Sequence, residues 1–262
     1  METYVDLVRY RELFGSLFRR DLRARYKGSV LGVAWSLANP LVLMGVYLLV
    51  FSTLWHVSNG IDYYPLYLLS GLAVWVFFAT SLQSASRSMV DYSELIRRVR
   101  FPRQLVAFST VATQLVAFGA MLAVLFVIDL AVLPRVRAEI WLAIPLAALV
   151  VAFVAGLALA IAAANVIFRD IEHLVSAALL PWFFLTPVLY TFSQFHQHPT
   201  LKEVLRWGNP ITPPIEALRA PLYLGRLPHW TDVVYLVGVT AASLALGAWV
   251  FSRVDDRIAV EL

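Results

Sequence analysis

Long runs of apolar residues, separated by short basic stretches, extend over the whole chain. Six runs are long enough for transmembrane helices, which need roughly 20 residues to cross a hydrocarbon core of about 30 Å; they cover residues 28–61, 63–86, 104–128, 140–168, 173–200 and 233–252. The alternating pattern of a membrane β-barrel is not seen in the sequence. The pattern therefore predicts an all-α integral membrane protein with six transmembrane helices.

The amino-acid composition agrees with this class of protein. Of the 262 residues, 60% are hydrophobic and 15% are charged, against about 25% charged in a soluble domain. That much apolar surface exceeds what one soluble core of this length buries. A soluble enzyme, a disordered protein and a nucleic-acid-binding domain are therefore excluded. The chain has no cysteine, so it forms neither a disulfide nor a thiolate metal site.

Lys and Arg are concentrated on one side of the predicted spans. Fifteen of them lie in residues 1–29, in the loop after the second span, at Arg169 and after the sixth span, whereas six lie on the other side. Because cytoplasmic loops are enriched in Lys and Arg, we expect both termini in the cytoplasm. The net charge of +4 then reflects membrane topology and anionic lipid headgroups, not nucleic acid.

Residues 4–26 have an amphipathic pattern that predicts a helix lying in the headgroup plane. Apolar residues recur there at spacings of three and four: Leu13, Phe14, Leu17, Phe18 and Leu22. Gly28 and Gly32 follow, either as a flexible elbow or as a G-x-x-x-G helix-packing motif. We expect an interfacial helix in residues 1–29, a membrane domain in residues 30–255 and a cytoplasmic tail in residues 256–262.

Two cytoplasmic segments are candidates for contact with a soluble partner. Residues 84–103 are too polar to span, and residues 93–99 are expected to form a short basic helix that either docks a partner or is simply solvated. Residues 168–173 make a tight turn between the fourth and fifth spans. The acidic residues of this turn are expected to stabilise the start of the fifth helix, to contact a partner, or both.

The outer segment, residues 191–230, is expected to contain two short helices around Gly208, Asn209 and Pro210. Neither is long enough to cross the bilayer, so they either dip into the outer leaflet or cover a pore mouth. His196 and His198 have no carboxylate at ligand spacing nearby, and no metal site is expected there.

Catalytic motifs are missing from the sequence. It contains no P-loop, no H-E-x-x-H, no G-x-S-x-G and no chain of titratable groups across the bilayer, so neither nucleotide hydrolysis nor a proton relay is expected in this chain. Asp129, near the outer end of the third span, is expected to pair with Arg135 or Arg137.

Embedded polar and small residues predict contacts between helices. Gln114 and Asn165 are expected to form interhelical hydrogen bonds. Ala152, Gly156 and Ala160 repeat a small residue at every fourth position, which permits close packing of the fourth span.

Aromatic residues crowd the first, second and fifth spans. They either line a conduit for a ligand with flat apolar faces, such as a sugar, or belong to the core and the lipid-facing surface. The candidates for the conduit are Tyr47, Phe51, Trp55, Tyr67, Trp75, Phe78, Trp182, Phe183 and Tyr190.

Four segments carry a family resemblance. They are R-D-L-R-A-R-Y-K-G-S-V-L-G-V-A-W-S-L-A-N-P-L at residues 20–41, S-E-L-I-R-R-V-R-F-P-R at residues 93–103, N-V-I-F-R-D-I-E at residues 165–172 and F-L-T-P-V-L-Y at residues 184–190. Asn209-Pro210 and then Arg219 follow. In order and spacing, this set resembles the membrane subunit of polysaccharide ABC exporters, the Wzm and TagG type of the ABC-2 transporter family.

That resemblance implies a homodimer of six-span subunits in the bacterial cytoplasmic membrane that docks two copies of a separate P-loop ATPase. It implies that the cargo is an undecaprenyl-type lipid-linked glycan of the O-antigen, teichoic acid or capsule kind. ATP and Mg belong to the partner subunit, and no cofactor is expected in this chain. The outer helices are expected to form an outer gate.

The resemblance also assigns roles to residues. The ATPase-coupling residues are expected to be Ser93, Glu94, Leu95, Ile96, Arg97, Arg98, Arg169, Asp170 and Glu172. The first, second and fifth spans, with the aromatic residues above, are expected to line the conduit. The helix at the cytoplasmic mouth is expected to contribute Arg19, Arg20, Arg23, Arg25 and Tyr26.

Other functions remain open from the sequence alone. The same ABC-2 architecture also exports drugs or lipids. A partner-free channel or secondary transporter is a second alternative, although no internal repeat is visible. A membrane-embedded enzyme is a third, for which paired acids or metal ligands are the expected sign, and none is seen.

Overall fold

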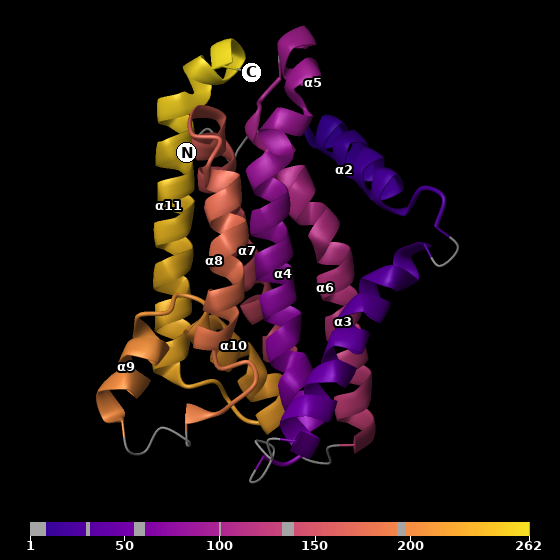
Figure 1. The fold of residues 1–262 in the computed structure, drawn as a ribbon, viewed down its shortest axis with the longest axis vertical. Helices are drawn as coiled ribbons and strands as arrows, with labels where there is room; N and C mark the ends of the chain where they lie inside the picture. Colours follow the sequence, from indigo (N-terminus) through magenta and orange to yellow (C-terminus); the bar gives the residue numbers. More distant parts are fainter. Residues whose placement is uncertain are drawn as a thin grey trace.

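A computed structural model of the chain describes residues 9–29, 32–54, 61–99, 101–132, 139–192 and 198–261, and within those ranges it contains helices and no strand (Figure 1). Four helices are long and apolar enough to cross a membrane. They are α4 (Tyr64–Asp91), α6 (Gln104–Val132), α7 (Ala143–Ile167, preceded by the 3-10 turn η3, Glu139–Leu142) and α11 (Trp230–Glu261). The all-α membrane class is thus confirmed.

The first and fifth apolar runs form shorter helices than predicted. The first contains η1 (Gly32–Ala34), α3 (Trp35–Tyr47) and a π-helical continuation, η2 (Leu48–Leu54). The fifth forms α8 (Ile171–Leu185), of only 15 residues. Thr186 after it is extended, with φ −99° and ψ 133°, because Pro187 disfavours a helical conformation in the residue before it. The predicted span over residues 173–200 is therefore wrong at its outer end.

Helix α4 lies at the centre of the molecule. It packs against α6, α7 and α8, and residues such as Leu68, Leu72 and Phe78 are fully buried. Helices α7 and α11 run side by side at very short range. A Cβ on Gly156 would lie 2.5 Å from the backbone of Ser243, which explains why the small residue predicted to allow close packing is needed there.

The two ends of the bundle differ (Figure 1). Helix α2 (Arg11–Tyr26), the short α5 (Ser93–Arg98) and the turn between α7 and α8 lie toward one end, together with the end of α11. At the other end lie α9 (Pro199–Trp207), α10 (Thr212–Arg219) and η5 (Ala220–Leu224). The two short helices predicted for residues 191–230, and the short helix predicted for residues 93–99, are confirmed.

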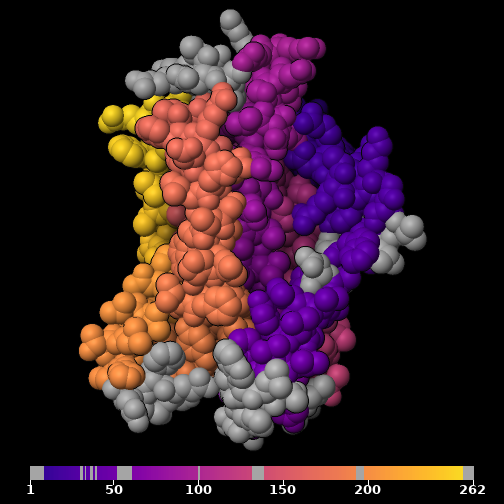
Figure 2. All heavy atoms as spheres, viewed as in Figure 1, coloured from indigo at the N-terminus to yellow at the C-terminus, as the bar shows by residue number. Residues whose placement is uncertain are grey.

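The amphipathic helix α2 lies on the flank of the bundle, against α6 (Figure 2). Its Leu17 is buried in an apolar cluster with Met89, Tyr92 and Leu105. Between α2 and α3, Gly28 and Gly32 have φ angles of +76° and +49°, which favour glycine. The elbow interpretation of these two glycines is the one that the backbone supports.

Candidate functional site

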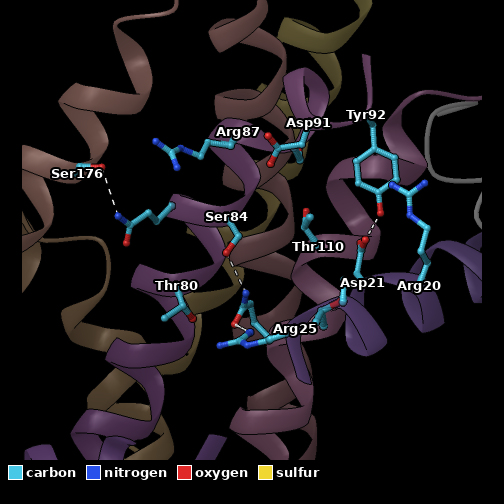
Figure 3. Close-up of a pocket in the computed structure, with 15 residues that line it drawn as sticks. Arg20, Asp21, Arg25, Thr80, Ser84, Arg87, Asp91, Tyr92, Thr110 and Ser176 are labelled. Atoms are coloured by element: carbon cyan, nitrogen blue, oxygen red, sulfur yellow. Dashed lines mark hydrogen bonds between the residues drawn. The ribbon is translucent and has the colours of Figure 1, made fainter. Parts of the chain in front are cut away.

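A polar stripe runs along one face of the second half of α4. Its members recur at spacings of three and four and therefore share a face: Thr80, Gln83, Ser84, Arg87, Ser88 and Asp91. Thr110, Thr113 and Gln114 form a similar stripe on α6. With residues of α2 and α8, these stripes line a pocket of about 690 Å³, here called the polar pocket (Figure 3).

Three helices are joined by hydrogen bonds across the polar pocket. Arg25 of α2 donates through Nη1 to Oε1 of Gln114 on α6. Gln114 in turn donates through Nε2 to Oγ of Ser84 on α4, at 2.9 Å. The interhelical role predicted for Gln114 is confirmed, and Arg25, predicted to lie at the mouth, faces the pocket (Figure 3).

A second set of contacts fixes α2 near the end of α4. The guanidinium carbon of Arg20 lies 4.1 Å from the ring centroid of Tyr92. The Tyr92 hydroxyl donates to Oδ1 of Asp21, and Ser109 donates to Oδ2 at 3.3 Å. Burial, together with the hydrogen bond to the Asp21 carboxylate, raises the pKa of Tyr92, so it stays a donor at neutral pH.

The other residues of α2 that were predicted to lie at the cytoplasmic mouth do not line the polar pocket. Arg19 and Arg23 are exposed, and Arg19 donates to the carbonyl of Gly15 in its own helix. Tyr26 is half-buried below the Arg25 guanidinium, at 6.0 Å.

Helix α8 contributes the wall of the polar pocket that lies opposite α2. Arg87 of α4 forms an ion pair with Glu172, and Gln83 donates to Oγ of Ser176 at 3.4 Å. Asn165 donates to the carbonyl of Ser86 and accepts the backbone N–H of Glu172, which confirms its predicted interhelical bond. Glu172 lies in the first turn of α8 as predicted, and its carboxylate reaches across to α4.

The proposed coupling elements lie at the α5 end of the bundle. Within α5, Ile96 is buried and anchors the helix on an apolar cluster, whereas Glu94, Arg97 and Arg98 are exposed and Ser93 and Leu95 are partly so. Arg98 pairs with Glu94 at 3.6 Å, which is a weak surface pair. Arg169 and Asp170 are exposed at the neighbouring turn, and Asp170 forms no capping bond with α8.

Most of the predicted conduit aromatics gather between α3, α4 and α8, whereas Tyr67 and Tyr190 meet at the start of α4, where the Tyr67 hydroxyl donates to the carbonyl of Tyr190. Phe183 contacts Tyr47 at 5.5 Å and Trp75 at 5.4 Å, and Phe78 contacts Trp182 at 5.2 Å between ring centroids. Tyr47 also meets Phe51, and Trp55 lies outside the described residues. Within one chain Tyr67, Trp75, Phe78 and Phe183 are buried, so they form part of its core.

A second polar network, at the end of the bundle opposite α5 and predicted to be the outer end, holds the irregular turn of residues 186–190. This outer clasp consists of Tyr64, Tyr67, Asn209 and Arg219. Each of them donates to the turn: Tyr64 to the carbonyl of Leu189, Tyr67 to that of Tyr190, Asn209 to the Thr186 hydroxyl, and Arg219 to the carbonyl of Pro187. The backbone groups freed by the end of α8 are thereby satisfied inside the protein.

Arg219 is the centre of the outer clasp. It is only 1% exposed, lies 3.8 Å from the Tyr67 ring centroid, pairs with Glu216 at 2.6 Å and donates to Ser70 at 3.3 Å. Gly71 makes room for it, since a Cβ there would lie 2.5 Å from Arg219 Nη2. The sequence motifs F-L-T-P-V-L-Y, N-P and the later arginine carried the resemblance, and the structure shows that they meet in one place.

Asp129 is fully buried on α6 and forms no hydrogen bond with the residues that the structure describes. Its predicted partners, Arg135 and Arg137, lie outside the described residues, as does His196.

The fold and these sites are those of a multi-pass membrane permease. The chain belongs to the ABC-2 type transporter family, whose sequence profile matches residues 12–223. It is 34% identical over 254 residues to the O-antigen export system permease protein RfbA of Myxococcus xanthus, covering 97% of this chain and 96% of that protein. It is also 29% identical over 254 residues to the O-antigen export system permease protein RfbA of Klebsiella pneumoniae, at 95% and 94% coverage.

Proposed function

We propose that this chain is the transmembrane subunit of an ATP-driven exporter that moves a lipid-linked polysaccharide across the bacterial cytoplasmic membrane. The observation that carries the proposal is similarity over almost the whole length to O-antigen export permeases. The polar pocket supports it, because a lining of arginines, hydroxyls and amides suits a phosphorylated sugar better than the hydrophobic drug of the alternative function.

The finer arrangement belongs to the same proposal. Helices α3 and α8 complete a set of six membrane-crossing elements, with both termini in the cytoplasm and two copies of the chain in the transporter. The α5 end then faces the cytoplasm, as its exposed arginines favour. At the outer end, α9 and α10 cover the mouth, held by the outer clasp. O-antigen, teichoic acid and capsule remain possible cargo classes.

Energy is proposed to come from a separate P-loop ATPase that binds ATP and Mg. Helix α5 is rigidly attached through buried Ile96, so a force on its exposed face is transmitted to α4 and α6. The exposed turn with Arg169 and Asp170 provides a second contact at the same end.

Charge reversal on α5 tests this coupling. Arg97→Glu combined with Arg98→Glu is expected to weaken binding of the ATPase about tenfold or more, because like charges replace complementary ones at the contact. Co-purification of the two subunits from membranes, followed by glycan export, measures the effect. Arg226→Glu, an exposed arginine beyond η5 at the opposite end, is the matched control. Normal ATPase recruitment by the double variant would contradict the assignment of α5.

A further inference from the structure

The polar pocket has a chemical order along its length. At the end away from α5, Arg25 and Gln114 meet Ser84. Asp91 lies seven residues further along α4, about 10 Å closer to the α5 end at the helical rise. Figure 3 shows Asp91 beside Arg87 and close to Tyr92, whereas Arg25 lies below Ser84, nearer the level of Thr80. A ligand in this pocket therefore meets the Arg25 cation at the end away from α5 and the Asp91 carboxylate toward the α5 end.

Two arginines of α2 line the polar pocket, Arg20 and Arg25, and both have N–H groups left to donate to a ligand. Arg87 is neutralised by Glu172, but among the described residues neither Arg20 nor Arg25 forms an ion pair within 4 Å. Arg25 instead bonds to a neutral amide through Nη1 alone. The remaining N–H groups of a guanidinium form a planar fork that matches two oxygens of a phosphate. The carboxylate oxygens of Asp21 accept from Tyr92 and Ser109 and form no ion pair within 4 Å with either arginine.

The wall of the pocket offers acceptors. Thr80, Thr110 and Thr113 donate their hydroxyl protons to backbone carbonyls of their own helices, at 2.7 to 3.0 Å. Their oxygens are then left to accept hydrogen bonds from a ligand. The carboxylate of Asp91, which forms no ion pair within 4 Å among the described residues, adds two more acceptor oxygens. Sugar hydroxyls are suitable donors to such a wall.

We propose that the polar pocket binds the phosphate and first sugar of a lipid-linked glycan, with the phosphate on Arg25 and the sugar on Asp91 and the hydroxyl wall. This inference rests on the proposed function. The order of groups matches the substrate, because an amphiphile with its tail in the bilayer places its phosphate deeper than its sugar. A volume of about 690 Å³ is within the range of pockets that hold a compact headgroup.

Binding of defined lipids to the purified full-length chain in nanodiscs tests the phosphate site. The probes are undecaprenyl diphosphate, the same lipid carrying one N-acetylglucosamine, undecaprenol without phosphate, and phosphatidylglycerol. Arg25→Gln is expected to weaken binding of both diphosphates about tenfold to a hundredfold, as for loss of a charge-assisted hydrogen-bond pair. Arg11→Gln, at an exposed position on the same helix, is the matched control and is expected to bind like the unaltered chain.

Asp91→Asn tests the sugar end separately. It is expected to reduce the additional affinity that the sugar confers severalfold while leaving undecaprenyl diphosphate unaffected. Thermal unfolding of each variant establishes that it is folded, and Arg25→Lys, which keeps the charge but not the fork, is expected to fall between Arg25→Gln and the unaltered chain.

The outcomes separate the possible sources of phosphate. Undiminished diphosphate binding by folded Arg25→Gln would overturn the proposal, and so would equal affinity for undecaprenol. Phosphatidylglycerol that competes as well as the sugar-bearing diphosphate would also overturn it, by making the pocket a site for ordinary phospholipid. Arg25-dependent diphosphate binding in a chain that exports no glycan would support the pocket and contradict the proposed function.

Discussion

A single buried arginine organises the outer end of this protein. Arg219 donates to the carbonyl of Pro187 and to Ser70, pairs with Glu216 and covers the Tyr67 ring, so α10, α4 and the turn after α8 are held by one side chain. A buried charge is costly unless every donor is matched, and this one is matched on all sides. Because the turn has no helical hydrogen bonds of its own, its conformation depends on these donors.

Replacing Arg219 by Met is expected to lower the free energy of unfolding by about 3–5 kcal/mol, because the carbonyl of Pro187 and the carboxylate of Glu216 lose their partner. Thermal unfolding of the purified chain in detergent measures the change. Arg226→Met, at an exposed position, is expected to change stability by about 0.5 kcal/mol or less. Equal stability of the Arg219 and Arg226 variants would show that the outer clasp does not hold the turn.

At the scale of the elements, α4 has two different faces. Its apolar face forms the core with α6 and α7, while its polar stripe from Thr80 to Asp91 faces the polar pocket. Helices α7 and α11, in contrast, meet through small residues. They pack so closely that a Cβ on Gly156 would overlap the backbone of Ser243, and a Cβ on Gly247 would overlap the backbone of Gly156.

Gly156→Ala is therefore expected to destabilise the protein by about 1–3 kcal/mol, since the new methyl group overlaps the backbone of α11. Chemical or thermal unfolding in detergent gives the value. Gly238→Ala on α11 is the matched control, because a Cβ there meets nothing within 4 Å, and helix propensity predicts a gain of up to about 1 kcal/mol. A stabilising effect of Gly156→Ala would contradict the observed α7–α11 packing.

The sequence predicted elements more reliably than their ends and their polar faces. The apolar runs identified the long helices, and Gln114 and Asn165 were recognised as interhelical residues because polar side chains in lipid need partners. The end of α8 was missed because composition does not show that Pro187 begins a turn satisfied by residues far along the chain. The polar pocket was missed as well, although the spacing from Thr80 to Asp91 contained the signal.

At the scale of the whole molecule, the two ends of the bundle carry different structural features. One end carries α5 and the adjacent turn with their exposed charged side chains, and the polar pocket between α2, α4, α6 and α8 lies toward the same end. The other end carries the short helices and the outer clasp. In this arrangement a cargo would be recognised at one end and released at the other, with energy supplied from outside the chain.

The most direct test of this account is transport in proteoliposomes. The chain is reconstituted alone, under an ion gradient, or together with the separate P-loop ATPase that the proposed function requires, and the transfer of a lipid-linked glycan across the bilayer is measured with and without ATP. The account predicts transfer only when both proteins and ATP are present, and no ATP hydrolysis by the chain alone. Transfer of the glycan by the isolated chain would contradict it.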